Sequence, residues 1–287
     1  MNDLTLIFLN YNTPDWISQA LTSLQSNYLS KTKLNVNVIV VDNASTDHSV
    51  AEIQNNFGWV TLIQAKENNG FSAGNNLALK NVQSRYAMLV NSDVEFTAGS
   101  NLDELVYFMD ARPEVAVTSP RVELTNGNID PASHRGEPTA WASLTYFTGL
   151  EKLFSSVPLF AQYHQSFKNY DQIHQIDACS GAAMMVRTAA MEKVGLLDER
   201  FFMYAEDLDW CSRFRDHGFQ IFYHPEVTVI HHKYKSGRAH QDSSVSKRTS
   251  SHFYQTMLQY FDKHYQNSYP FFVRWGLQFF IWYKTRN

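Results

Sequence analysis

Residues 36–47 read VNVIVVDNASTD. The apolar, β-branched run at 36–41 predicts a buried strand, and Asp42 ends it. Residues 43–47 are turn formers, and a helix is predicted to follow through Ile53. A buried strand, a polar turn and a helix in this order form the repeating unit of an α/β domain.

The same pattern recurs on both sides of this stretch. Apolar runs predict further strands at 4–9, 60–63 and 86–90, and helices are predicted after Thr13-Pro14 and over about 76–80. This alternation predicts an α/β fold with a mostly parallel central sheet flanked by helices. Because ligands bind beyond the carboxyl ends of such strands, the residues at those ends are the first candidates for a site.

The second half of the chain is less regular. Residues 126–138 are predicted as a loop, and the apolar run AAMMV at 182–186 follows Ser180-Gly181. A last strand is predicted over 227–230, directly before His231-His232. We find no internal repeat and no low-complexity tract, so nothing predicts a repeat architecture.

The composition indicates a globular protein with a substantial core. Of the 287 residues, 44% are hydrophobic and 18% are charged, which argues against disorder. The net charge of −4 gives no support for a nucleic-acid partner. Cys179 and Cys211 form no CxxC pattern, which fits a reducing compartment. The start of the chain does not read as a signal peptide and no apolar run is long enough to span a membrane, so we expect a cytoplasmic protein.

Carboxylates stand at the ends of two predicted strands. Asp42 is suited to accept hydrogen bonds from a nucleobase or a ribose, or alternatively to cap the next helix. Asn91, Ser92 and Asp93 follow the strand at 86–90. Asp93 is suited to bind a hard divalent cation, which prefers oxygen ligands, or alternatively to form an Asx-turn. Both acids are expected to face one crevice.

A glycine- and asparagine-rich segment, ENNGFSAGNN at 67–76, lies between these two ends. It matches neither GxGxxG nor a P-loop. Glycines such as Gly70 allow a close backbone approach, and the amides of Asn69 and Asn75 offer hydrogen-bond donors. The segment is therefore predicted either to contact a nucleotide or sugar or to be an ordinary loop.

Three acids occur within an apolar and aromatic stretch, FFMYAEDLDW at 201–210. Burying a carboxylate is costly unless it is paired, metal-bound or protonated. Glu206, Asp207 and Asp209 are therefore candidates for proton transfer. The alternative is an ordinary helix start, where acids interact favourably with the helix dipole.

Two adjacent histidines, His231 and His232, end the last predicted strand. Neighbouring residues of a strand face opposite sides, so we expect only one of them to point into the crevice. That histidine is suited to complete a metal site with Asp93 or to contact a diphosphate.

In this order, the segments resemble the family-2 inverting glycosyltransferases with the GT-A fold, especially their bacterial rhamnosyltransferase-type members. The resemblance covers about residues 4–240. Its matching segments are LNYN (9–12), VVDNASTD (40–47), NNGFSAGNN (68–76), LVNSDV (89–94), SGAAMMVRTAAMEKVGLLDERFFMYAEDLDWCSR (180–213) and VIHHKYKSG (229–237).

The resemblance also implies residue roles. Asp207 matches the general base of the ED motif, with Glu206 beside it. Asp93 matches the last acid of a DxD-like metal motif, in which Asn91 takes the first place. His231 matches a histidine implicated in metal or diphosphate contact, although His232 stays open. The implied nucleotide-sugar site comprises Asn10, Asp42, Asn43, Asn69, Gly70, Asn75, Asn91 and Ser92, and the implied cofactor is Mg²⁺ or Mn²⁺.

The implied reaction is sugar transfer with inversion. The donor is a nucleotide sugar, with dTDP-rhamnose favoured and UDP-linked hexoses left open. The acceptor is a saccharide or a polyprenyl-diphosphate-linked saccharide in bacterial surface polysaccharide (O-antigen) synthesis. The rival hypotheses are a catalytically silent sugar-nucleotide-binding subunit of a polysaccharide assembly complex and a nucleotidyltransferase.

The resemblance also suggests a division of the chain. A GT-A domain is expected at 1–240, with a nucleotide-binding half at about 1–95 and an acceptor and catalytic half at about 96–240. Residues 241–287 are expected to form a helical, amphipathic extension. Its last segment, YPFFVRWGLQFFIWYKTRN, mixes aromatic and basic residues, which suits a membrane surface. It is predicted either to bind the inner face of the cytoplasmic membrane peripherally or to dock on the core.

Overall fold

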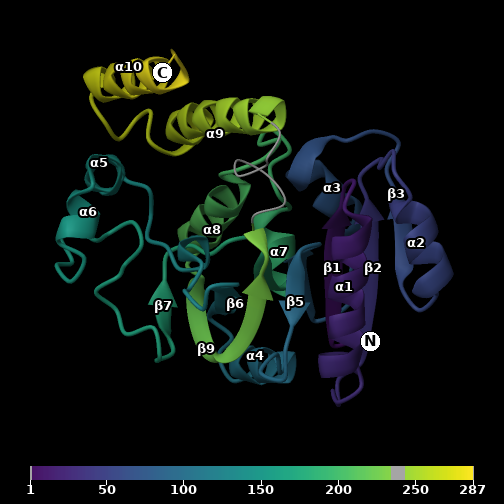
Figure 1. Ribbon diagram of the computed structural model, residues 1–287. Helices are drawn as coiled ribbons and strands as arrows, with labels where there is room; N and C mark the ends of the chain where they lie inside the picture. Colours follow the sequence, from purple (N-terminus) through teal and green to yellow (C-terminus); the bar gives the residue numbers. More distant parts are fainter. Residues whose placement is uncertain (1, 234–242, 287) are drawn as a thin grey trace.

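The computed structural model describes residues 2–233 and 243–286 (Figure 1). The strands are β1 (Leu4–Asn10), β2 (Val36–Asp42), β3 (Thr61–Gln64), β4 (Tyr86–Asn91), β5 (Val94–Phe96), β6 (Val115–Leu124), β7 (His174–Ile176), β8 (Ala183–Arg187) and β9 (Gln220–His231). The α-helices are α1 (Pro14–Leu24), α2 (Ser49–Asn56), α3 (Gly70–Leu79), α4 (Leu102–Asp110), α5 (Ala140–Thr148), α6 (Leu150–Leu153), α7 (Thr188–Val194), α8 (Glu206–Asp216), α9 (Ser243–His264) and α10 (Phe271–Arg286).

All these strands form one sheet in the order β3-β2-β1-β4-β8-β6-β9-β5, and β7 pairs with β9. The first half of the chain supplies the parallel part, β3-β2-β1-β4. In the second half, β8 runs antiparallel to β4 and β6, and β5 and β7 run antiparallel to β9. The α/β fold with flanking helices is confirmed. The sheet as a whole is mixed, because an apolar run predicts that a strand is buried but not the direction of its neighbour.

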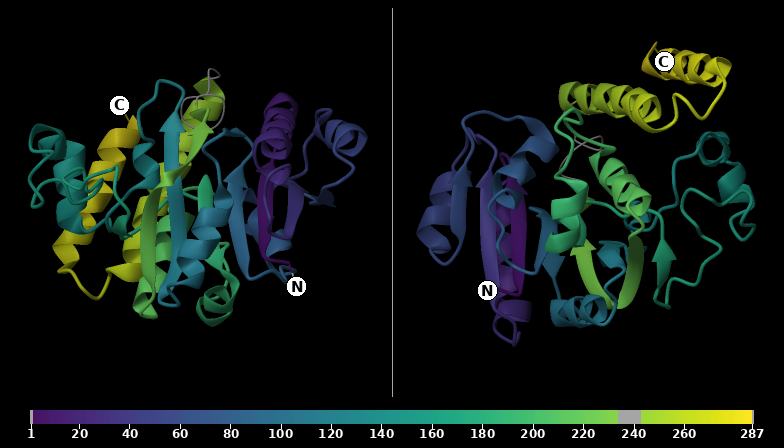
Figure 2. Two further views of the ribbon diagram at one scale, coloured as in Figure 1. Left: turned by 90° about the horizontal axis from the view of Figure 1, so that it is seen from below. Right: turned by 180° about the vertical axis from the view of Figure 1, so that it is seen from behind.

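Helices cover both faces of the sheet (Figure 2). Side chains alternate along β1, so that Leu6 and Phe8 face one core and Ile7 faces the other. The first core is closed by α1, α2 and α4, and the second by α3, α7, α8 and α9. The strand ends that carry the predicted site residues therefore emerge from a sheet that is buried on both sides.

Two element boundaries differ from the sequence prediction. The helix predicted over about 76–80 begins at Gly70, because Gly70 adopts a φ of 87° and the next residue, Phe71, donates its N–H to the carbonyl of Phe202. The last strand begins at Gln220 rather than 227, since it pairs with the unpredicted strand β6. Both differences arise from contacts with distant segments.

The C-terminal helices lie at one end of the molecule, beside α8 and α5 (Figures 1 and 2). Tyr260, Phe261 and Tyr265 of the α9 region are buried in the second core. The expected boundary between residues 240 and 241, like residues 234–237 of the last matching segment, lies outside the described residues. None of the helices in the described part is long and apolar enough to cross a membrane.

Candidate active site

Asn10 and Asp42 lie side by side at the carboxyl ends of β1 and β2, where the strand register pairs them. Asn10 Nδ2 donates to Asp42 Oδ1 over 3.0 Å. The hydroxyl of Ser45 donates to the same oxygen (2.6 Å), and its backbone N–H donates to Asp42 Oδ2 (2.9 Å). Asp42 does not cap α2, because that helix begins at Ser49 and its first N–H donates to Asp47 Oδ1. Asp42 is thus buried and oriented at the strand end.

A short polar chain continues from this pair towards β4. The hydroxyl of Thr13 donates to Asn10 Oδ1 (2.7 Å) and lies 3.1 Å from the hydroxyl of Ser92. Thr13 therefore links two strand ends instead of capping α1, whose first turn receives no hydrogen bond from this side chain. Because Asp93 directly follows Ser92, the acids at the ends of β2 and β4 belong to one polar edge of the sheet.

Asp93 meets His231 at this edge. Antiparallel pairing of β5 with β9 places His231 opposite Val94, so that His231 Nε2 lies 3.2 Å from Asp93 Oδ1. Asn91 Nδ2 lies 3.4 Å from the same ring nitrogen. His232 points elsewhere and contacts Glu95 Oε2 through its Nε2 (2.7 Å). Of the two histidines, His231 is thus the one beside Asp93.

The other side of the His231 ring faces a fully buried acid, Asp130, that sequence reasoning missed. Nδ1 of His231 lies 2.9 Å from Asp130 Oδ2, and Lys233 Nζ lies 2.6 Å from Asp130 Oδ1. Burial alone disfavours the imidazolium, yet hydrogen bonds to Asp130 and Asp93 raise the pKa of His231 to about 9. Burial likewise opposes ionisation of Asp130, but His231 and Lys233 hold its pKa well below the usual range.

The glycine- and asparagine-rich segment mainly makes contacts with other parts of the protein. A Cβ on Gly70 would overlap the carbonyl group of Phe202, so the close approach that glycine permits here is to the chain's own backbone. Asn75 is buried and donates its amide to the Phe71 carbonyl within α3. Asn43 Nδ2 donates to Asn68 Oδ1 and to the Gly70 carbonyl.

Asn69 differs from these buried amides because it stays partly exposed at the start of α3. Its Nδ2 donates to Glu67 Oε1 over 3.2 Å. Among the predicted sugar- or nucleotide-contacting residues of this segment, Asn69 is therefore reachable from solvent, whereas the amide of Asn75 is used inside the helix.

A strained turn leads into the acidic helix α8. Tyr204 and Ala205 have φ values of 72° and 64°, a left-handed conformation that costs non-glycine residues about 1–3 kcal/mol each. The turn presents Glu206 and Asp207 as the first residues of α8, and both are buried. The predicted helix start is therefore observed, and it does not exclude catalysis because such strain is concentrated at functional sites.

Asp207 is paired with an arginine that sequence reasoning also missed. Arg135 Nη2 lies 2.6 Å from Asp207 Oδ2 and donates to the Cys179 carbonyl over 3.0 Å. Arg135 and Asp130 belong to the same loop, and the five intervening steps span at most about 18 Å. One loop thus contacts His231 at the sheet edge and Asp207 on α8. No sequence signal marked these two loop residues, since the loop has no periodic pattern.

Glu206 lies beside this ion pair, and no ion pair to Glu206 itself occurs among residues 2–233 and 243–286. Its Oε2 has no hydrogen-bond partner within the described ranges. Burial, together with the negative charge of Asp207, raises the pKa of Glu206 to about 8. Near neutral pH the two adjacent carboxyl groups are therefore chemically distinct, because Glu206 holds a proton while Asp207 pairs with a cation.

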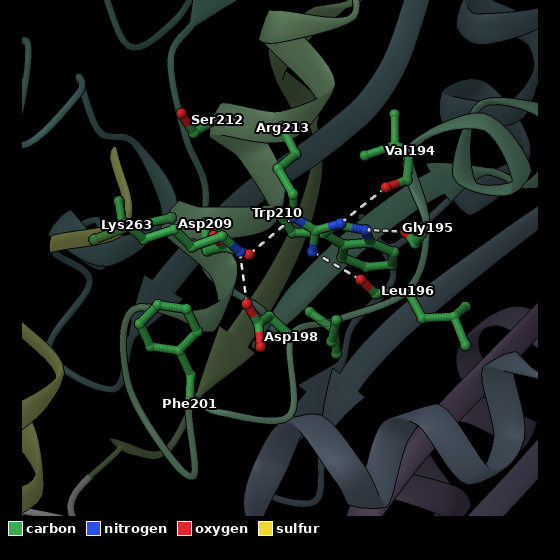
Figure 3. Close-up of polar contacts among 12 residues, drawn as sticks. Val194, Gly195, Leu196, Asp198, Phe201, Asp209, Trp210, Ser212, Arg213 and Lys263 are labelled. Atoms are coloured by element: carbon green, nitrogen blue, oxygen red, sulfur yellow. Dashed lines mark hydrogen bonds and ion pairs between the residues drawn. The ribbon is translucent and has the colours of Figure 1, made fainter. Parts of the chain in front are cut away.

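The third acid of the stretch, Asp209, is structural. Figure 3 shows Lys263 of α9 reaching Asp198 and Asp209, at 2.6 Å and 2.5 Å. His264 Nε2 and Arg213 Nε also contact Asp209, at 2.7 Å and 2.9 Å. Burial opposes ionisation of Asp209, but His264 and Lys263 lower its pKa. These contacts anchor α9 to the helix that carries Glu206 and Asp207.

Comparison with known families now identifies the chain. The family model described as Glycosyl transferase family 2 matches residues 5–193, which is more than half of the sequence. The chain belongs to glycosyl transferase family 2. The matched range contains Asp42, Asp93 and Arg135, whereas Asp207 and His231 lie beyond its end.

Relatives of this family-2 glycosyltransferase extend the comparison. It is 23% identical over 273 residues to the N-acetylglucosaminyl-diphospho-decaprenol L-rhamnosyltransferase of Mycobacterium tuberculosis, covering 91% of this chain and 85% of that protein. It is 25% identical over 242 residues to the low-salt glycan biosynthesis hexosyltransferase Agl10 of Haloferax volcanii, covering 81% of this chain and 68% of that protein.

Solved structures support the same fold. The mannosyltransferase PcManGT from Pyrobaculum calidifontis, in complex with GDP-Man and Mn²⁺, matches with a TM-score of 0.59 at 16% identity, over 94% of this chain and 67% of that one. At this level of identity the likeness shows the fold alone, and it confirms the predicted GT-A architecture.

The side chains at the sheet edge of this glycosyltransferase fit a divalent cation. Asp93 offers a carboxylate oxygen, and His231 would offer its Nε2 after releasing the proton that its raised pKa keeps on the ring, because a metal binds only the neutral imidazole. Mn²⁺ and Mg²⁺ accept such ligands. Across residues 2–233 and 243–286, no group of three or more His, Cys, Asp or Glu side chains is arranged to hold a metal ion. Phosphate oxygens of a donor and water would therefore complete the coordination, as is common for these cations.

Proposed function

We propose that this family-2 enzyme is an inverting rhamnosyltransferase. It transfers rhamnose from dTDP-rhamnose to a polyprenyl-diphosphate-linked saccharide during bacterial surface polysaccharide synthesis. The observation that carries the catalytic part is the loop from Asp130 to Arg135, which contacts His231 at the sheet edge and Asp207 on α8. The rhamnosyltransferase of Mycobacterium tuberculosis, similar over most of both chains, supports rhamnose as the transferred sugar and a lipid-linked saccharide as the acceptor.

The donor is assigned to the polar edge of the sheet. Asp42, oriented by Asn10, accepts hydrogen bonds from the nucleobase, while Asn43, Asn69, Asn91 and Ser92 line the path of the sugar nucleotide. Asp93 and His231 would hold a Mg²⁺ or Mn²⁺ ion. When bound, this ion supplies positive charge that stabilises the leaving nucleoside diphosphate.

The chemistry is assigned to Asp207. The oxygen of an acceptor hydroxyl forms a bond to the anomeric carbon, and the bond from that carbon to the diphosphate breaks. The acceptor proton passes to Asp207, and the bonding electrons leave with the nucleoside diphosphate. Glu206, protonated near neutral pH, adds no second negative charge beside Asp207. Attack from the face opposite the leaving group inverts the anomeric configuration.

A lipid-linked acceptor requires access to a membrane surface, and helix α10 offers a suitable face. Val273, Leu277 and Phe280 pack towards the body of the protein. The opposite side exposes the aromatic stripe, defined as Phe271, Phe272, Trp275, Phe279, Trp282 and Tyr283. Aromatic rings with Lys284 and Arg286 nearby suit peripheral binding at the inner face of the cytoplasmic membrane. Docking on the core and membrane binding are thus compatible for this helix.

The proposal is tested with dTDP-rhamnose and an N-acetylglucosaminyl-diphosphoryl lipid in the presence of Mn²⁺. The expected result is release of dTDP that requires the acceptor, with a glycosidic bond of inverted configuration by NMR. Asp207→Asn should lose about 10²–10⁴-fold in turnover while still binding the donor. The matched control Asp171→Asn changes an exposed acid and should keep turnover.

Other outcomes exclude parts of the proposal. Turnover with UDP-hexoses but not with dTDP-rhamnose would show that the donor assignment is wrong. Donor binding with no acceptor-dependent release from any nucleotide sugar would favour the silent binding subunit. Near-normal turnover of Asp207→Asn would remove Asp207 as the base.

A further inference from the structure

Two adjacent buried carboxyl groups begin α8, and only one of them is suited to act as the base. Glu206 and Asp207 both lie under 10% exposed. Two such groups in a shared apolar setting cannot both ionise at low cost, and nothing in their own sequence determines which one does. The difference between them comes from Arg135, whose guanidinium contacts Asp207.

We propose that Arg135 is a positioning residue that makes Asp207, rather than Glu206, the ionised carboxylate of this pair and holds it in place to accept the acceptor's proton. The inference rests on the proposed function, because it presumes that Asp207 is the base. It adds a residue outside the matching segments and assigns it an effect on the charge state of the pair.

The backbone fixes Arg135 from both sides. Its N–H donates to the Ala178 carbonyl and its carbonyl accepts from the Ala178 N–H, both over 2.9 Å. The next residue, Gly136, donates its N–H to the Tyr163 carbonyl over 2.7 Å, and a Cβ there would overlap the carbonyl of Gln162. These backbone contacts hold this part of the loop in place, so the tertiary structure determines where the Arg135 guanidinium lies.

The charges around the guanidinium favour this role. Its Nη2 divides its contacts between Asp207 and the Cys179 carbonyl, and its Nε has no partner within the residues that the structure describes. The titratable groups facing the cluster are Glu206, Asp207, Asp209 and Cys211 from α8, Tyr163 from the segment before β7, and Cys179 from the segment before β8. Arg135 is the cation that contacts Asp207 directly, so its removal leaves the acid pair without this nearest positive charge.

The test compares Arg135→Met, which removes the charge, with Arg135→Lys, which keeps it. The readout is the pH dependence of kcat/KM with dTDP-rhamnose and the N-acetylglucosaminyl-diphosphoryl lipid. Loss of a cation beside a carboxylate raises the pH at which that carboxylate ionises, and here this is the first proton that the pair gives up. We expect the acid limb of the Arg135→Met profile to move up by about one pH unit or more. The Arg135→Lys profile should stay close to the wild-type position at a reduced rate.

A merely structural arginine would lower the rate equally at every pH. The matched control is Arg215→Met, which removes an ion pair between α8 and Glu137 in the same loop (2.7 Å). The acid limb of the Arg215→Met pH profile should stay at the wild-type position. An unmoved acid limb in Arg135→Met would overturn the inference.

A second readout does not depend on the donor. Carboxyl ¹³C NMR titration of the resting protein, assigned with Glu206→Gln and Asp207→Asn, should show the titration of the pair at higher pH in Arg135→Met. No movement would again overturn the inference. The two proposals fail separately, since an inactive Asp207→Asn with an unmoved pair rejects only the role of Arg135, whereas an active Asp207→Asn rejects the base itself.

Discussion

Nε2 of His231 lies 3.2 Å from Oδ1 of Asp93, although these residues are far apart in the sequence. The antiparallel pairing of β5 with β9 creates this relationship, because it sets His231 opposite Val94. The adjacent His232 instead packs against Trp16, with 4.8 Å between the ring centroids and the ring planes tilted by 39°. The two neighbouring imidazoles therefore form a natural matched pair for mutagenesis.

We expect His231→Ala to weaken Mn²⁺-dependent binding of dTDP by at least about tenfold, since it removes an assigned cation ligand. His232→Ala should change this affinity by less than about threefold, because His232 pairs with Glu95 instead. Isothermal titration calorimetry measures the affinity of both variants for dTDP, once in the presence of Mn²⁺ and once in the presence of EDTA. Equal losses in the two variants would contradict the assignment of His231.

Glu206→Gln should stabilise the protein at alkaline pH. The pKa of Glu206 is raised from 4.5 to about 8 in the folded state, so between these values the folded protein holds a proton that the unfolded chain has released. The stability contributed by this group is therefore fully present below pH 4.5 and is lost as the pH rises through about 8. Glutamine cannot ionise and avoids the loss.

Urea denaturation at pH 5 and pH 8.5 checks this prediction. The free energy of unfolding of Glu206→Gln should exceed that of the wild type by less than about 1 kcal/mol at pH 5 and by on the order of 3 kcal/mol at pH 8.5. The control Glu226→Gln alters an exposed side chain and should show no such widening. A constant difference at both pH values would argue against a buried, protonated Glu206.

Lys263→Met should destabilise the fold by about 3 kcal/mol, because it leaves the fully buried Asp209 without one of its cations. The matched control is Lys80→Met. Lys80 lies 3.5 Å from Glu199 with half of both side chains exposed, so its removal should cost less than about 1 kcal/mol. Urea midpoints compare the two, and similar losses would show that α9 is not anchored through Lys263.

Replacing Trp275, Phe279 and Trp282 together by serine should reduce binding to anionic phospholipid vesicles by tenfold or more. Each large aromatic side chain that enters an apolar phase contributes about 1.5–3 kcal/mol. Co-sedimentation measures the bound fraction, and circular dichroism checks that the fold is kept. Tyr107→Ser, which removes an exposed ring from α4, should leave binding unchanged. If the unaltered protein does not bind such vesicles, the membrane proposal is wrong.

The strands of the first half could be predicted closely. The runs at 4–9, 36–41 and 86–90 are mostly apolar because these strands are buried on both faces. A strand buried in this way needs apolar residues in succession, which can be recognised in the sequence. Asp42 and Asp93 interrupt or follow these runs, so their position at the carboxyl edge of the sheet could be inferred before their contacts were known.

The partners in the second half could not be predicted. Strands β5, β6 and β7 leave weak signals because they are short or interrupted by polar residues, and their directions depend on long-range pairing. Gly70 illustrates the same limit. Its glycine character suggested contact with a ligand, whereas in the fold it makes room for the carbonyl of Phe202.

The primary structure was therefore sufficient for the α/β class, the family resemblance and the carboxylates at 42, 93, 206 and 207, since apolar periodicity and short motifs are local properties. Folding placed His231 rather than His232 beside Asp93, raised the pKa of the buried Glu206, and brought Asp130 and Arg135 from a loop without a pattern to His231 and Asp207. These outcomes depend on burial and on charges brought together from distant segments, and the local sequence encodes neither.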